Sequence, residues 1–520
     1  MPAPLRIAIF GGAGEIGGNR ILLSWDDTAW LLDFGTRFGA VSRYFEEFVK
    51  PRGATLGLRD YLRMGLLPPL EGLYRDDLWC HELDLWDRYR DRPDWRRVPE
   101  LKGVLLSHAH VDHNGCLGFL NPEIPVYTGL VTAIIGKCLQ DPRPTGVDGE
   151  FCYLVPRCST GDVLAAAKGE ARIQRRHLIC EGGPEIQRAM SELETFWASV
   201  PGTRSELNST PLELVEPALH GLRFWRVDHS IPGSGAFAIQ TSIGWVVYTG
   251  DLRRHGHSSW RTERFAEAAA ALKPALLIVE GTRLDVEKPV TEPEVHQAAD
   301  DVVAREPGLV IADFTARNIE RLRTFRDIAK ARGRRLVVTT KDAYLLERLH
   351  VIDPHIPTPE DDGLAVLKEP LGQVQMWERE VHNRFAGHLI DARSVRKEPG
   401  AFILCLSYWD IGNLVDLDPD GGTYLYSSSE AYNEDQKIDQ QRLENWLDNF
   451  KLKKVGGLPN AERGPYHASG HISGPALEEL INQIGAERIL PVHTEHPEWF
   501  EQRWSKKVVV PRYGEDVVIG

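Results

Sequence analysis

Three histidines and an aspartate crowd the stretch SHAHVDHNG, residues 107–115, which directly follows the apolar run GVLL. A single histidine beside an apolar strand is usually a packed core residue, but four neighbouring donors are hard to explain by packing. Neutral imidazole nitrogens and carboxylate oxygens are common zinc ligands, and a catalytic zinc site keeps one position open for water. The stretch therefore predicts a metal site with the candidate ligands His108, His110, Asp112 and His113.

Other candidate ligands stand where other apolar runs end. His229 follows LRFWRVD, Asp251 follows GWVVYTG, and His493 follows RILPV. Asp33 has the same placement after WLL. Side chains at the ends of separate strands can converge on one edge of a sheet. We therefore expect these residues to complete the metal centre.

The elements that would position these residues show an α/β pattern. Residues 12–17, GAGEIG, match a dinucleotide-binding turn, but that turn requires a helix next. The stretches NRILLSW and TAWLLDFG, separated by Asp26 and Asp27, instead indicate a β-hairpin. Between 290 and 405, helical stretches such as EVHQAADDVVARE alternate with strand-like ones such as GLVIADF. This alternation predicts βαβ units and a parallel sheet.

Two long segments offer no clear chemistry. Residues 40–100 are rich in Trp, Tyr, Arg and Asp, and such a mixture could form a nucleic acid groove. The simpler alternative is an elaborated surface loop with short helices. Residues 130–222 show mixed helical patterning.

Composition limits the class of protein. A chain of 520 residues is too long for one hydrophobic core, so we expect two or three domains. It has neither a long apolar run nor a signal-peptide pattern, and its seven scattered cysteines contain no CxxC pair, so we expect a cytoplasmic protein without a membrane partner. A net charge of −14 argues against broad, non-specific binding of nucleic acids. It still permits a locally basic cleft.

A set of motifs carries a family resemblance across Gly11 to Glu495. In order along the chain they are GGAGEIGGN, LLDFG, SHAHVDHNG, VDHSIPGSG, YTGDLRRHG, VEGT, HASGHISG and PVHTE. They resemble the metallo-β-lactamase superfamily and, within it, the β-CASP nucleases of the ribonuclease J type. The resemblance implies an α/β fold in which residues 1–282 and 461–520 form a metallo-β-lactamase αββα sandwich. Residues 283–460 would form an inserted β-CASP α/β domain.

The resemblance also implies two zinc ions, with Mn²⁺ as the alternative metal. One ion would be held by His108, His110 and His229, the other by Asp112, His113 and His493. Asp251 would bridge the two, and Asp33 would orient the ligand loop from just outside. Paired ions of this kind can activate water and clamp a phosphate.

Asp112, Glu280 and His471 are the catalytic residues that the resemblance implies. His471, in HASGH, would stabilise the transition state or protonate the leaving 3′-oxygen, and Glu280, in VEGT, would hold and polarise it. Ser469, Gly470 and Ser473 would bind a substrate phosphate, although Gly and Ser are also common in ordinary turns. Arg317, in FTARN, would line a nucleic acid channel.

The expected activity is hydrolysis of single-stranded RNA as a 5′→3′ exonuclease with endonuclease activity. Alternatives are a DNA-directed nuclease, a small-molecule metallohydrolase of the thioesterase or lactamase kind, and a binding protein without catalysis. The long segments, the unusual stretch SYWDIGNLVDL and the short sequence after His493 depart from the family pattern. They leave substrate choice open, and we expect a monomer or a homodimer.

Overall fold

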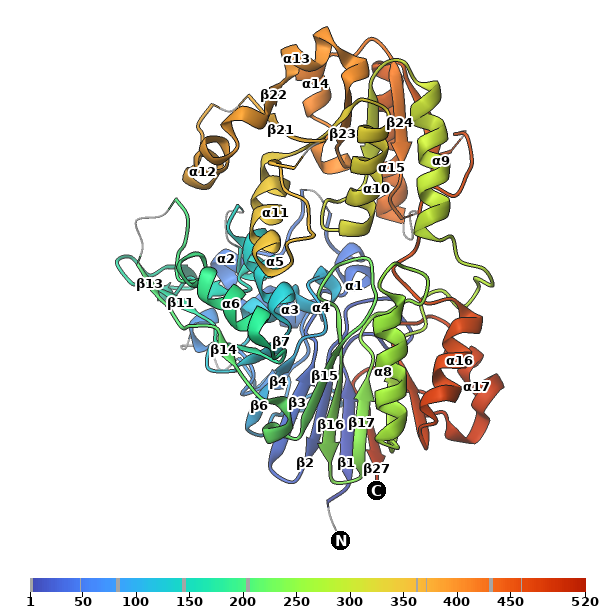
Figure 1. Cartoon of the computed structure of the whole chain (residues 1–520). Coiled ribbons are helices and arrows are strands. Elements are labelled where there is room, and N and C mark those ends of the chain that lie inside the picture. The colour runs from blue at the N-terminus through green and yellow to red at the C-terminus, as the bar shows by residue number, and fades with distance from the viewer. Residues whose placement is uncertain are drawn as a thin grey trace.

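The computed structural model describes residues 3–46, 48–80, 85–142, 146–202, 206–361, 363–370, 372–429, 434–459 and 461–520. Figure 1 shows two bodies, one above the other, and both termini lie at the bottom of the lower body. Within the described ranges, every helix is too short or too polar to cross a lipid bilayer.

The lower body contains an eight-stranded sheet that holds the first candidate ligands. The predicted hairpin is confirmed, because β2 (Ile21–Trp25) pairs antiparallel with β3 (Thr28–Leu32) around Asp26 and Asp27. From edge to edge the sheet runs β14 (Glu213–Leu214), β12 (His177–Ile179), β7 (Val126–Thr128), β6 (Leu101–Leu105), β3, β2, β1 (Leu5–Ile9) and β27 (Asp516–Ile519).

A five-stranded sheet faces the first one. Its order is β15 (Leu222–Arg226), β16 (Gly235–Thr241), β17 (Gly244–Tyr248), β18 (Leu276–Val279) and β26 (Arg488–Pro491). Ile7 and Leu23 of the first sheet share a buried core with Tyr248 and Ile278 of the second. Helices α8 (Ser259–Ala271) and α16 (Gly474–Ile484) cover the outer side of this second sheet. Chain segments that lie more than 200 residues apart thus form one layered body.

The upper body contains the predicted parallel sheet, which is confirmed. It has seven strands in the order β22 (Leu389–Asp391), β21 (Leu364–Lys368), β20 (Arg335–Val338), β23 (Phe402–Cys405), β19 (Val310–Asp313), β24 (Gly422–Tyr426) and β25 (Leu452–Gly456). All neighbouring pairs are parallel. The helical patterns correspond to α9 (Glu292–Arg305), α10 (Ile319–Ala331), α11 (Thr340–Ile352) and α15 (Glu434–Asn449).

The two long segments add to the lower body. Most of the aromatic residues in 40–100 are packed, with Tyr61, Tyr74, Trp86 and Tyr89 in the core, which agrees with the loop interpretation for that part of the segment, whereas Tyr44 and Phe48 near its start are exposed. The segment 130–222 contains the predicted helical parts but also short strands, such as the hairpin of β9 (Arg157–Thr160) and β10 (Val163–Ala166), that its pattern did not indicate. Helix α5 (Leu130–Gln140) reaches the upper body, because Tyr344 on α11 donates a hydrogen bond to Asp141 (2.9 Å).

Candidate metal centre

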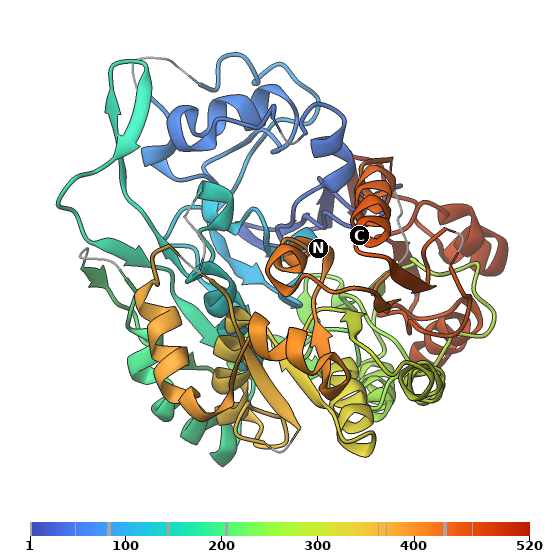
Figure 2. The same ribbon diagram turned by 90° about the horizontal axis from the view of Figure 1, so that it is seen from above.

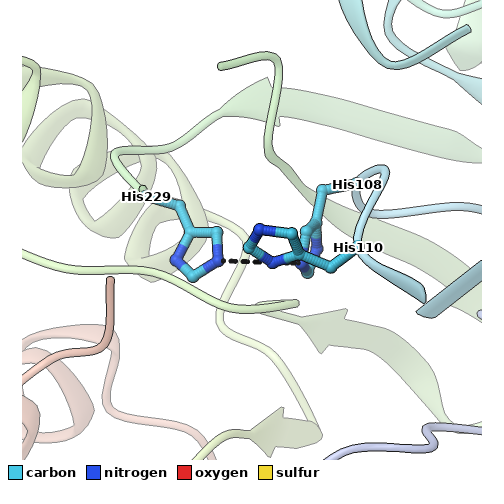
Figure 3. A group of neighbouring side chains, drawn as sticks. All are labelled: His108, His110 and His229. Carbon is cyan, nitrogen blue, oxygen red and sulfur yellow. Dashed lines mark hydrogen bonds between the residues drawn. The ribbon is translucent and has the colours of Figure 1, made fainter. Parts of the chain in front are cut away.

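Three histidines from two loops bring one ring nitrogen each to a common point (Figure 3). His110 Nδ1 lies 3.0 Å from His108 Nε2 and 3.2 Å from His229 Nε2. A tetrahedral ion with metal–nitrogen bonds of about 2.0–2.1 Å separates its ligand nitrogens by roughly 3.3 Å. The spacing of the three nitrogens is therefore that of three ligands to one ion.

A second group of ligand atoms lies against the first. His113 Nε2 is 3.1 Å from Asp251 Oδ2, and His493 Nε2 is 3.3 Å from Asp112 Oδ2. Asp251 Oδ2 also lies 3.7 Å from His108 Nε2. Asp251 thus stands between the two groups of candidate ligand atoms.

The far ring nitrogens are held by partners that fix which nitrogen faces the centre. His113 Nδ1 donates to Asp33 Oδ2 (2.7 Å), and His229 Nδ1 donates to the carbonyl of Gly470 (2.5 Å). Asp33 also accepts hydrogen bonds from the backbone N–H of Ser107 and the hydroxyl of Tyr248. Asp33 and His493 have φ angles of 54° and 52°, a conformation that is unfavourable for residues other than glycine. Hydrogen-bond partners such as Asp33 and the Gly470 carbonyl orient the ligand histidines and select their tautomer.

The electrostatic environment keeps the three histidines of the first group neutral and the two aspartates of the second group ionised. Burial lowers the pKa of His108 and His229 well below the usual range and that of His110 to about 4, so these rings are neutral. Burial opposes ionisation of Asp112 and Asp251, but the histidines His113 and His493 hold the pKa of both carboxyls below its usual value. Burial likewise opposes the charge on His113, whose pKa is raised because carboxylates surround it.

Two buried polar atoms without hydrogen-bond partners indicate whether the site suits a metal ion. Among the described residues, His113 Nε2 and Asp251 Oδ1 have no hydrogen-bond partner although both are fully buried. Orphaned buried polar atoms are costly, and native structures satisfy nearly all of them. Cations between the two groups would satisfy both atoms, so the residues present fit a pair of divalent metal ions.

His471 adjoins the ligands and is held by Glu280. His471 Nδ1 lies 2.9 Å from Glu280 Oε2 and 3.9 Å from Asp251 Oδ2. Burial opposes the charged ring, but the carboxylates, first of all Glu280, raise the pKa of His471 to about 9. The remaining nitrogen, Nε2, is therefore the one available to a bound molecule.

Thr282 also belongs to this network, and it was not among the expected site residues. Its hydroxyl accepts from His493 Nδ1 (2.8 Å) and donates to Glu280 Oε2 (2.8 Å). A hydrogen-bonded chain therefore links a ligand histidine to His471 through Thr282 and Glu280. The motif VEGT contained this residue, but nothing in its spacing indicated a contact with His493, 211 positions away.

The expected phosphate-binding residues lie beside His471, in different settings. Ser469 and Ser473 line a cavity of 280 Å³ together with His471, Arg283, Lys288 and Arg463. No carboxylate is among the described residues that line it. Gly470 instead uses its carbonyl to orient His229. Arg317 lines a second cavity of 710 Å³ at the edge of the upper sheet, and its charge contributes to lowering the pKa of His110.

Comparisons with known proteins extend along the whole chain. No protein-family model matches it. The chain is 23% identical to Ribonuclease J of Pyrococcus abyssi over 99% of this chain and 97% of that protein. It is 26% identical to Ribonuclease J 2 of Streptococcus pyogenes and 23% identical to Ribonuclease J of Thermus thermophilus, covering 95% and 96% of this chain and 70% of each relative.

A solved structure shares the fold. The crystal structure of a protein of unknown function from Enterococcus faecalis aligns over 99% of this chain and 100% of that chain, with a TM-score of 0.66 and 19% identity. The resemblance seen in the motifs is confirmed by the relatives that match 95% or more of the chain. In sequence, the chain is similar along nearly its whole length to proteins named Ribonuclease J.

Proposed function

We propose that the chain is a two-metal nuclease that hydrolyses phosphodiester bonds of single-stranded RNA from the 5′ end. Its relatives are named ribonucleases, which are hydrolases. In this proposal residues 1–282 and 461–520 form a metallo-β-lactamase sandwich around the metal centre. Residues 283–460 form the β-CASP domain, which corresponds to the upper body in Figure 1. Figure 2 looks down on this domain from above.

The pairing of His471 with Glu280 beside the ligand cluster is the observation that carries the proposal. When bound, two divalent ions, zinc or manganese, supply an activated water and positive charge for the phosphate under attack. His108, His110 and His229 would hold one ion, Asp112, His113 and His493 would hold the other, and Asp251 would contribute to both. His471, with Nδ1 committed to Glu280, presents Nε2 to the leaving 3′-oxygen and gives it a proton.

The basic cavity beside His471 supports recognition of a 5′-phosphate. Arg283, Lys288 and Arg463 bring positive charge to a space that also contains Ser469 and Ser473. A terminal phosphate bound there would hold the first internucleotide bond near the metal ligands, and binding energy at this remote group would orient the reacting bond. Hydroxyls and cationic side chains are common partners of phosphate.

The proposal is tested by measuring cleavage of strands that differ in their 5′ group and in their sugar. Matched RNA and DNA strands carrying a 5′-hydroxyl, monophosphate or triphosphate are incubated with the protein and zinc or manganese. We expect stepwise release of nucleotides from 5′-monophosphorylated RNA and slower cleavage of the other strands. Internal cuts that ignore the 5′ group would contradict exonuclease action, and faster cleavage of DNA would contradict an RNA substrate.

A further inference from the structure

An exposed patch of aromatic and arginine side chains borders the metal centre. It lies just before and at the start of the first long segment and comprises the exposed Phe38, Arg43, Tyr44 and Phe48 with the partly buried Arg37, which together we call the aromatic–arginine patch. We propose that this patch binds the substrate strand outside the cleavage site, with bases on its rings and phosphates on its arginines. The inference rests on the proposed nuclease function.

The patch begins next to the metal ligands. The residue before it, Thr36, donates its backbone N–H to the carbonyl of Val111 (2.9 Å), which precedes the ligand Asp112. The guanidinium of Arg37 forms an ion pair with Glu15 (2.7 Å). The backbone of Glu15 forms an isolated β-bridge with Thr494, the neighbour of the ligand His493. Figure 1 shows α1 (Phe38–Ser42) beside α4 (Val111–Asn114), below the upper body.

The aromatic rings of the patch are unusually exposed for their size. Phe48 is 85% exposed, Phe38 48% and Tyr44 46%, and α1 buries none of its five residues. The aromatic residues that follow in the same segment, such as Tyr61 and Trp86, are buried. Exposed apolar groups gathered within a polar rim mark interaction surfaces. Burial in the fold therefore does not explain why this part of the segment carries aromatic residues.

Arginines gather next to these rings on an acidic molecule, although Arg37 pairs with Glu15 (2.7 Å) and Arg92 with Asp94 (2.7 Å). Arg37, Arg43 and Arg92 line a hollow of 370 Å³, where Glu15 is the only acid among the described lining residues. The chain as a whole carries a net charge of −14. The guanidinium of Arg43 lies 5.5 Å from the centre of the Tyr44 ring, and that of Arg37 lies 4.6 Å from that of Tyr513. Local positive charge of this kind attracts a polyanion to one place on the surface.

This combination fits a single strand of nucleic acid. Unpaired bases stack on aromatic rings and on arginine planes, while arginines neutralise the phosphates between them. The patch shares no residue with the basic cavity beside His471. In this proposal the terminal phosphate occupies that cavity and the downstream nucleotides rest on the patch.

Strand binding by a double variant tests the inference. Arg43→Glu combined with Tyr44→Ala reverses one charge and removes one ring, both exposed at the surface, and is compared with the parent by fluorescence anisotropy. Both proteins carry His471→Ala to slow cleavage. The probes are 5′-monophosphorylated RNA strands of about 15 nucleotides and of about three nucleotides. The matched control is Arg6→Glu with Leu219→Ala, which changes an arginine that is 56% exposed and a leucine that is 80% exposed on other parts of the surface.

We expect the parent and the control to bind the longer strand more tightly than the short one. The patch variant should bind the longer strand about 10- to 100-fold more weakly than the parent, because it lacks one stacking ring and repels the phosphates with an added negative charge. Its salt dependence should also become shallower by about 0.7 in the logarithmic slope for each phosphate that the variant no longer neutralises. Equal binding of the longer strand by parent and patch variant would overturn the inference. Absence of cleavage of any strand by the wild type would overturn the nuclease function instead.

Discussion

Asp251 is the residue on which both groups of candidate ligands depend. Its Oδ2 atom lies 3.1 Å from His113 Nε2 and 3.7 Å from His108 Nε2. We expect Asp251→Ala to abolish RNA cleavage, since each ion loses a ligand and the buried charge that attracts it. Elemental analysis of the purified variant should show less than the wild-type metal content. A variant with full metal content and full activity would contradict the bridging role.

Substitution of His471 should lower the rate of catalysis without loss of metal binding. It lies beside the ligands, but its ring is tied to Glu280 rather than to either group of ligand histidines. We expect His471→Ala to retain nearly all of the metal and to lower the cleavage rate by about 10²–10⁴, the size of a general acid–base contribution. Single-turnover rates measured with intact metal content test this. A wild-type rate would exclude the role proposed for His471.

Thr282 gives a third prediction at this scale. Its hydroxyl is the only atom of the side chain that can both accept from His493 and donate to Glu280. Thr282→Val keeps the shape and removes the hydroxyl, so the ring of His493 loses its partner. We expect metal affinity, measured by competition with a chelator, to fall by about 10- to 100-fold, the usual cost of losing a partner of a metal ligand. Thr282→Ser should restore it, and wild-type affinity in Thr282→Val would show that the hydrogen bond is unimportant.

At the scale of elements, buried titratable side chains stand at the ends of strands in both bodies. Asp313 ends β19 and is buried, and it accepts hydrogen bonds from Tyr424 (2.7 Å) and Ser428 (3.0 Å). Burial raises the pKa of Asp313 to about 6, so the folded state binds a proton there that the unfolded state has already lost. Stability from this group is present below the unfolded pKa and decreases as the pH rises to about 6.

We expect Asp313→Asn to remove this pH dependence. Between about pH 4 and pH 6 the wild type should lose up to roughly 3 kcal/mol of unfolding free energy relative to the variant, which corresponds to about two pKa units. Denaturant titrations of both proteins across this range measure the difference. Parallel stability curves for the two proteins would contradict the buried, proton-binding state of Asp313.

The elements best predicted from sequence are those with strong local patterns. The hairpin around Asp26 and the alternating helices and strands between 290 and 405 are present as expected. The segment 130–222 was harder, because its strands are as short as two residues and show no clear alternation. The buried aromatic residues of 40–100 resembled a binding surface because sequence does not reveal which rings are covered.

Across the whole molecule, the sequence indicates which residues could bind a metal but not which groups hold those residues in place. His108, His110 and Asp112 lie in one short motif, whereas the contact of Gly470 with His229 spans 241 positions and uses a backbone carbonyl. No side-chain pattern encodes such a contact, and the phosphate-binding role expected of Gly470 stays a prediction beside it. The domain boundaries, the assembly as a monomer or homodimer and the choice of metal stay predictions.

Charge is also distributed unevenly across the molecule. The chain carries a net charge of −14, yet each of two hollows near the metal ligands has three Arg or Lys side chains among its described lining residues and at most one carboxylate. An acidic surface with basic hollows restricts a polyanionic strand to the places where it can be cut. Net charge alone argues only against broad, non-specific binding of nucleic acids.

The dependence of RNA cleavage on bound metal is the decisive measurement. The protein is stripped with a chelator, titrated with zinc or manganese, and assayed at each step with 5′-monophosphorylated RNA while bound metal is measured. We predict no cleavage without metal and full activity as the content approaches two ions per chain, the number that the two ligand groups would hold. Unchanged cleavage by the stripped protein, or no cleavage of RNA with two ions bound, would contradict a two-metal ribonuclease.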